Sequence, residues 1–125
     1  MKSIIVSMIA AAGLMVAGSA MATDMPALAK KSGCTACHSI DKKVVGPAWM
    51  DVSKAYKSNG ATTTGKKVSD ILAENKAKTA SEWLAQKVAK GGKGNWGSAA
   101  MIPNSPKVSD AEIHELVEFV LGLAK

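Results

Sequence analysis

Two cysteines and a histidine form the most restrictive feature of this 125-residue chain. Cys34 and Cys37 are the only cysteines, and His38 follows the second one directly. On one turn of helix, side chains at positions i and i+3 face the same way. The motif therefore places two thiols side by side with an imidazole next to them, and any fold for this chain has to accommodate that cluster.

Four kinds of site are compatible with this cluster, and C-x-x-C-H favours attachment of a c-type haem. Two such thiols can add to the vinyl groups along one side of a porphyrin, and His38 can then ligate the iron. A thioredoxin-like redox pair would need a preceding strand, which the pattern does not indicate. A zinc site would need His114 as fourth ligand, and the adjacent Cys37 and His38 fit one tetrahedron poorly. A structural disulfide between Cys34 and Cys37 is the remaining alternative.

The first 22 residues have the pattern of a cleavable signal peptide. Lys2 precedes an apolar run over residues 4–16, and Ala20-Met21-Ala22 forms an A-x-A cleavage signature. The run is shorter than the roughly 20 apolar residues that a spanning helix needs. We therefore expect a Sec signal over residues 1–22, export to the periplasm, one domain over 23–125, and no stable membrane insertion.

Charge and size narrow the classes of function. The net charge is +6, and all sixteen basic residues are lysines. Arginine, the usual reader of base edges, is absent, so no nucleic acid partner is expected. The length excludes a large multidomain enzyme. No nucleophile–base pair or phosphate loop is evident, so catalysis by side chains is not expected.

The hydrophobic periodicity is helical, with no strand-like alternation. The pattern predicts an all-α fold of four to five short helices without a β-sheet. Two helices should open with an S/T-x-x-E capping box, at Thr79 and at Ser109. Helices are expected over about 24–32, from Pro47 to the Asn59-Gly60 pair, over 69–75, from Thr79 to the Gly91-Gly92 pair, and from Ser109 through Leu121.

A sixth iron ligand would come from His114 or from one of three methionines outside the signal segment. Met25 precedes the first expected helix, and Met50 lies inside the second, which would place it on the His38 side of a haem. Met101 lies in the long loop 91–108, far enough along the chain to reach the opposite face. A loop of this length is unusual unless it binds something. Met101 is therefore favoured, with His114 or an open iron as alternatives.

These residues resemble those of a class I c-type cytochrome, of the small bacterial monohaem kind. The resemblance covers most of residues 23–125 and rests on Cys34–His38, on Gly46-Pro47, on GPAWMDVSKAY, and on Trp96-Gly97 followed by Met101. It implies the cytochrome c fold, with the helices wrapped around one covalently bound haem c. It also implies that the Pro47 carbonyl accepts a hydrogen bond from the ligand histidine, which orients the ring.

The same resemblance implies further haem contacts. Trp96 would donate its indole N–H to a propionate, and Asn104 would contact the region of the methionine sulfur. Lys87 stands at a position where the family often has an arginine that pairs with a propionate, and lysine cannot form the bidentate fork. Ser98 replaces the family's proline after Trp-Gly. Residues 58–80 behave as an insertion near one haem edge.

The expected function is a periplasmic single-electron carrier that cycles one low-spin haem c between Fe(II) and Fe(III), and not an enzyme. Its partners would be redox proteins with acidic docking faces, attracted by lysines near the haem segments. The chain would act as a monomer or as a subunit of a heteromer. The alternatives are a dedicated haem c subunit of a periplasmic oxidoreductase, or a haem sensor or peroxidase with a displaceable sixth ligand. The lysines in question are at positions 30, 31, 42, 43, 87, 90 and 93.

Overall fold

The computed structural model describes residues 24–124, and the predicted signal peptide lies outside this range. Within it no strand is formed, and only isolated bridges link extended residues. The prediction of an all-α fold is confirmed for this part of the chain. Its elements are α2 (Ala27–Lys31), the 3₁₀ turn η1 (Cys34–Ala36), α3 (Trp49–Lys57), α4 (Val68–Glu74), α5 (Ala80–Lys90) and α6 (Asp110–Leu121).

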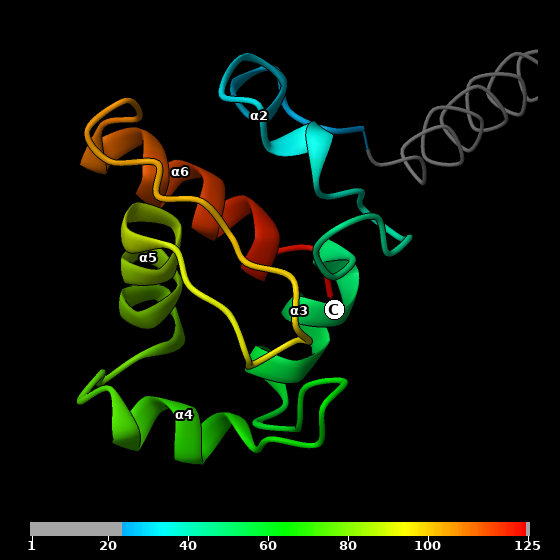
Figure 1. Cartoon of the computed structure of the whole chain (residues 1–125), viewed down its shortest axis with the longest axis vertical. Helices are drawn as coiled ribbons and strands as arrows, with labels where there is room; N and C mark the ends of the chain where they lie inside the picture. Colours follow the sequence, from blue (N-terminus) through cyan, green and yellow to red (C-terminus); the bar gives the residue numbers. More distant parts are fainter. Residues whose placement is uncertain (1–23, 125) are drawn as a thin grey trace, which may run out of the picture.

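Helix α6 packs against α2, α3 and α5 and so joins both ends of the fold (Figure 1). Its capping box is complete: the Ser109 hydroxyl accepts the Glu112 N–H, and the Glu112 carboxylate accepts the Ser109 N–H. Hydrogen bonds from the backbone and hydroxyl of Ser109 hold the pKa of Glu112 below its ordinary value. One face of α6 forms an apolar stripe that is buried, with Ile113, Leu116, Val117 and Val120 facing the interior.

The end of α6 is fastened to α3 by one buried serine. Ser53 is fully buried, and its hydroxyl donates to the Leu121 carbonyl at 3.0 Å and accepts the Ala124 N–H at 2.9 Å. Lys57 adds a bond of 2.6 Å from its ammonium to the Ala124 carbonyl. Carbonyls at the end of a helix have no partner inside it, so these bonds complete the C-terminus of α6.

Two local expectations differ from the structure. Helix α3 begins at Trp49 and not at Pro47, because Ala48 is extended and the carbonyls of Ser39 and Ile40 accept the first two helical N–H groups. The expected second half of the capping box at the start of α5 is wrong. The Thr79 hydroxyl accepts the Glu82 N–H, but the Glu82 carboxylate takes the N–H of Lys78 instead.

The segment between α5 and α6 has no helix and makes a long excursion, as predicted (yellow in Figure 1). It leaves the end of α5, runs toward α3, turns and comes back toward α6. Residues 92–101 close on themselves through two bonds between Gly92 and Met101, of 3.0 and 2.8 Å, and one from the Gly94 N–H to the Gly97 carbonyl. We call residues 92–101 the ligand hairpin, with its base at Met101 and its tip around Trp96.

Candidate haem site

The attachment motif lies on a single tight turn. Gly33 adopts a left-handed conformation (φ 81°) that turns the chain out of α2, and η1 follows at once. The N–H groups of Cys37 and His38 both donate to the Cys34 carbonyl, at 3.2 and 2.9 Å. Both cysteines are half-buried free thiols, and burial raises the pKa of Cys34. The motif thus has neither the disulfide nor the preceding strand that two of the alternatives required.

The imidazole of His38 is oriented by the backbone of Pro47. Its Nδ1 lies 2.9 Å from the Pro47 carbonyl oxygen. A carbonyl only accepts, so Nδ1 carries the proton and Nε2 keeps a free lone pair. Burial lowers the pKa of His38 and so favours the neutral ring, whereas the hydrogen bond to Pro47 opposes this shift. The ring is therefore in the form that ligates a metal.

Gly46 leaves the space in which this ring lies. A Cβ atom at Gly46 would stand 2.5 Å from Cε1 of His38 and 3.0 Å from both ring nitrogens. The Gly46 N–H donates to the Cys37 carbonyl at 2.8 Å, so the backbone here is also tied to the motif. A glycine is required at this position because the imidazole packs directly on its Cα.

Met101 is placed by the base of the ligand hairpin. It is partly buried, and its backbone is paired with Gly92. Gly91 lies so close to the Met101 carbonyl that a side chain on Gly91 would collide with it. The Gly91-Gly92 pair therefore does more than end α5: it allows the segment that carries Met101 to pass against the helix end.

Asn104 ties the same segment to α5. It is buried, and its amide NH₂ donates to the carbonyls of Val88 and Ile102, each at 3.1 Å. Its backbone N–H also donates to Val88. In the structure Asn104 thus serves as an anchor for the chain after Met101, and its expected contact with the sulfur region stays a prediction.

Lys87 lies on α5 next to the ligand hairpin, and Trp96 lies at the tip of the hairpin. The Lys87 ammonium is 5.9 Å from the centroid of the Trp83 ring and close to Gly92. Burial lowers the pKa of Lys87. The two ion pairs of residues 24–124, Lys31–Glu112 and Lys66–Glu74, do not involve it. Trp96 packs from the tip of the hairpin against the main core, the hydrophobic cluster that includes Trp49, Tyr56 and Trp83.

A buried hydrogen bond between Tyr56 and Trp83 was not anticipated from the sequence. The Trp83 indole N–H donates to the Tyr56 hydroxyl at 3.0 Å, joining α5 to α3. Burial raises the pKa of Tyr56, partly offset by hydrogen bonding to the indoles of Trp83 and Trp96. No local sequence pattern signals this contact, since the partners are 27 positions apart.

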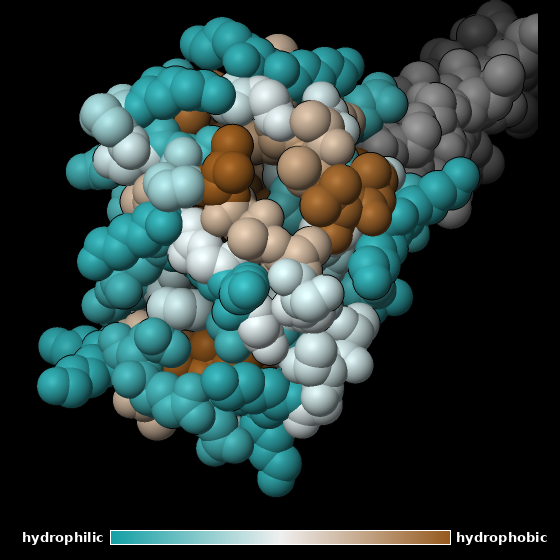
Figure 2. Space-filling model, in the orientation of Figure 1, coloured by the Kyte–Doolittle hydropathy of each residue, from teal (hydrophilic) through white to brown (hydrophobic). Residues whose placement is uncertain are grey.

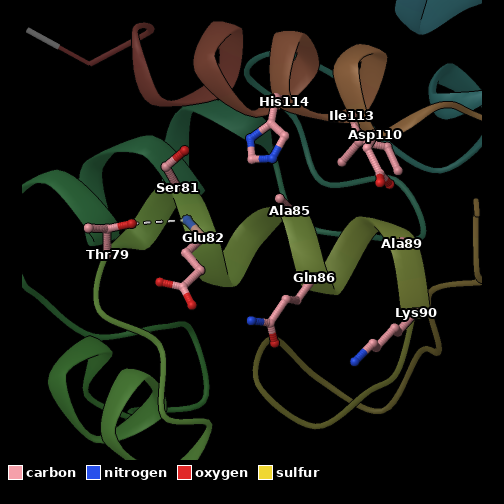
Figure 3. A pocket seen from close by; sticks show the side chains of 10 residues that line it. All are labelled: Thr79, Ser81, Glu82, Ala85, Gln86, Ala89, Lys90, Asp110, Ile113 and His114. Atoms are coloured by element: carbon pink, nitrogen blue, oxygen red, sulfur yellow. Dashed lines mark hydrogen bonds between the residues drawn. The ribbon is translucent and has the colours of Figure 1, made fainter.

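The other ligand candidates have different surroundings. Figure 3 shows His114 pointing from α6 into an open pocket between α5 and α6, which no residue of the attachment motif lines. Met25 packs against the main core, and Met50 lies in α3. Across residues 24–124 no three His, Cys, Asp or Glu side chains are grouped so that they could hold a metal ion, so the four-ligand zinc site is not formed.

The residues present fit a covalently bound haem. Two adjacent free thiols, a neutral imidazole with its Nε2 free, and a thioether on a separate segment make up the donor set such a group requires. The cradle at Gly46 holds the imidazole in one orientation. The chemistry of this donor set is that of a c-type cytochrome.

Comparison with known proteins gives the same class. The family model described as cytochrome c matches residues 22–124. Over 96 residues the chain is 41% identical to cytochrome c-551 of Allochromatium vinosum, covering 77% of this chain and 82% of that protein. Over 123 residues it is 36% identical to cytochrome c-552 of Nitrosomonas europaea, covering 98% and 99%. The crystal structure of that cytochrome c552 superposes with a TM-score of 0.58 at 35% identity, covering 77% of this chain and 95% of the other.

The chain belongs to the cytochrome c family. It has the cytochrome c fold, and it carries a single covalently attached haem c. It is an electron-transfer protein and not an enzyme, and it interacts with redox partners. The resemblance to a class I c-type cytochrome is thereby confirmed.

Proposed function

We propose that this protein is a periplasmic electron shuttle in which Cys34 and Cys37 would hold the haem and His38 and Met101 would ligate its iron. The observation that carries the proposal is the hydrogen bond of 2.9 Å from His38 Nδ1 to the Pro47 carbonyl. It fixes the tautomer and the orientation of the ring and raises its basicity, as partners of metal-bound histidines do. The bound haem supplies a one-electron iron couple.

The thioether of Met101 would tune that couple. Sulfur is a soft donor that favours Fe(II), and a Met/His pair raises the reduction potential. His38 is anchored by the Pro47 carbonyl, and Met101 by the base of the ligand hairpin. The positions of these two ligands would therefore change little between oxidation states. Small rearrangement is what fast single-electron transfer requires.

Lys87 and Trp96 would bind the haem propionates. The Lys87 ammonium is half-buried and has no carboxylate partner in residues 24–124. A buried charge is stabilised by a partner of opposite charge, and a propionate would supply one. The Trp96 indole has one N–H, which hydrogen-bonds to Tyr56 in the structure and would turn to a propionate when the haem is bound. Asn104 would keep the hairpin in register while its remaining oxygen faces the Met101 region.

The location in the cell follows from the N-terminal pattern. A signal peptide over residues 1–22 would direct a domain of residues 23–125 to the periplasm, with 58–80 as an insertion in that domain. No helix in residues 24–124 is long and apolar enough to cross a membrane.

Partner docking is proposed at an apolar surface bordered by lysines. The large exposed hydrophobic residues of the described range are Val44, Val45 and Ile102, which flank the two ligand-bearing segments. Figure 2 shows hydrophobic side chains gathered on one face and surrounded by hydrophilic ones. A partner with an acidic rim and an apolar centre would match this surface.

The spectrum of the purified protein tests the ligand set. We expect the oxidised protein to show the weak near-red band of a sulfur–iron bond, and the reduced protein to bind carbon monoxide slowly if at all. Rapid binding of carbon monoxide would instead indicate an open sixth position and favour a sensor or peroxidase. A colourless protein would contradict the proposal, because it would show that no haem is bound.

Electron transfer with an acidic redox protein should slow as salt is added. The Debye length falls from about 30 Å at 0.01 M to about 8 Å at 0.15 M, so steering by lysines weakens. We expect the second-order rate measured by stopped flow to fall about tenfold over this range. Lys42→Gln with Lys43→Gln should flatten the salt dependence, whereas Lys76→Gln with Lys78→Gln should leave it unchanged. A rate insensitive to salt would refute acidic docking.

A further inference from the structure

Two threonine hydroxyls reach from the 58–67 loop to the tip of the ligand hairpin, and a third braces one of them. The Thr64 hydroxyl donates to the Asn95 carbonyl at 2.8 Å, and the Thr63 hydroxyl donates to the Trp96 carbonyl at 3.3 Å. Thr62 is buried, and its hydroxyl lies 2.9 Å from that of Thr64. We call Thr62, Thr63 and Thr64 the threonine clasp. It joins segments that are more than 30 positions apart in the sequence.

The loop that carries the clasp is itself well braced. The Thr62 N–H donates to the Lys66 carbonyl and the Gly65 N–H to the Thr62 carbonyl, each at 2.9 Å. Gly65 takes a left-handed conformation (φ 82°), which closes this turn. The turn is tied onward to α4, because the Val68 N–H donates to the Gly60 carbonyl and Lys66 pairs with Glu74. The loop that carries the clasp is thus held in place by its own hydrogen bonds and by its connection to α4.

Hydrogen bonds at both ends of the ligand hairpin couple the position of its tip to that of its base. Paired bonds between Gly92 and Met101 close the base, and the Gly94–Gly97 bond closes the turn at the tip. Beyond the base, Asn104 holds the chain to α5. A closed hairpin held at both ends keeps its base in place. Without the clasp, only the base anchor and the packing of Trp96 on the core resist displacement of Met101.

We propose that the threonine clasp positions Met101: by holding the tip of the hairpin, it would limit how often the Met101 sulfur leaves the haem iron. The inference rests on the proposed role of Met101 and assigns a task to the segment that the sequence marks as an insertion. Thr63 and Thr64 are exposed and bury little apolar surface. Their loss should therefore ease local opening of the hairpin much more than it weakens the fold as a whole.

The test is the rate at which imidazole displaces Met101 in the oxidised holoprotein. In excess imidazole this rate is limited by release of the methionine, and loss of the near-red band reports it. The double variant Thr63→Val, Thr64→Val keeps the shape of both side chains and removes both donors. We expect release to become about five- to tenfold faster, in line with the loss of two exposed hydrogen bonds.

Two control proteins separate positioning from general stability. Thr63→Ser with Thr64→Ser retains both hydroxyls and should restore the wild-type rate. Ser58→Ala removes a hydroxyl from the same loop whose bond, 2.6 Å to the Lys54 carbonyl, does not touch the hairpin, and it should leave the rate unchanged. The unfolding midpoint of all three proteins should stay close to that of the wild type.

Equal release rates in the Val variant and the wild type would overturn the proposal, as would an equal acceleration in Ser58→Ala. A wild-type protein without the near-red band would instead contradict the ligand assignment of Met101, so the two failures are distinguishable. If the double variant does not fold, Thr64→Val alone, which removes the shorter bond, should still speed release about threefold. The Met101 amide is bonded to the Gly92 carbonyl in the base of the hairpin. Its rate of hydrogen exchange should rise in the Val variants and stay unchanged in the Ser and Ser58→Ala controls.

Discussion

The Met101→Ala holoprotein is expected to lose the near-red band, to bind carbon monoxide rapidly when reduced, and to have a lower reduction potential. Alanine offers no donor atom, so the sixth position opens and the preference of sulfur for Fe(II) is lost. Each tenfold loss of that preference lowers a one-electron potential by about 59 mV, and we expect at least one such step. Absorption spectra, carbon monoxide kinetics and voltammetry give the three measurements.

Matched methionine variants make this result specific. Met25→Ala and Met50→Ala should keep the band, because Met25 packs on the core and Met50 lies in α3. Met101→His should lose the band and yet keep the sixth position closed, since an imidazole replaces the thioether. Retention of the band in Met101→Ala, or its loss in Met50→Ala, would show that another residue ligates the iron.

Gly46→Ala is expected to lower the stability of the holoprotein by about 1–3 kcal/mol, the usual cost of forcing an extra methyl group into a packed site. The new Cβ would lie 2.5 Å from Cε1 of His38, while Cys37 holds the Gly46 backbone and Pro47 holds the ring. One of these bonds has to break or stretch. In a domain of this size 1 kcal/mol corresponds to roughly 4–8 °C, so the thermal midpoint should fall by about 10 °C.

Gly60→Ala provides the control for that substitution. A Cβ at Gly60 would meet only the end of the Ser58 side chain at 3.2 Å and the backbone of Ala55 at 3.8 Å, so the thermal midpoint should change little. Spectra add a second readout, because displacement of the His38 ring alters the haem bands in Gly46→Ala alone. Similar midpoints and spectra in both variants would mean that the imidazole has room to move and that the Gly46 cradle does not orient it.

Local features of the fold were predictable because they depend on residues within one helical turn. The Ser109 capping box is complete as its spacing indicated, and the apolar stripe of α6 is buried. Where a longer-range contact competes, the local pattern was misleading. Lys78 takes the carboxylate that the box at Thr79 would have used, and α3 starts late because the chain before Pro47 supplies its first hydrogen bonds.

The sequence alone determined the chemistry of this protein, since a C-x-x-C-H motif places two thiols and an imidazole on one turn whatever the rest of the chain does. It also indicated the Gly46-Pro47 pair, the loop with Met101, and the class of fold. Only the tertiary structure decided where Lys87 and Asn104 lie, how Ser53 closes α6, and that the threonine clasp holds the hairpin. The contacts of Asn104 with α5, of Ser53 and of the threonine clasp join residues from 16 to 71 positions apart. Such pairings depend on the path of the whole chain, which helical periodicity does not specify.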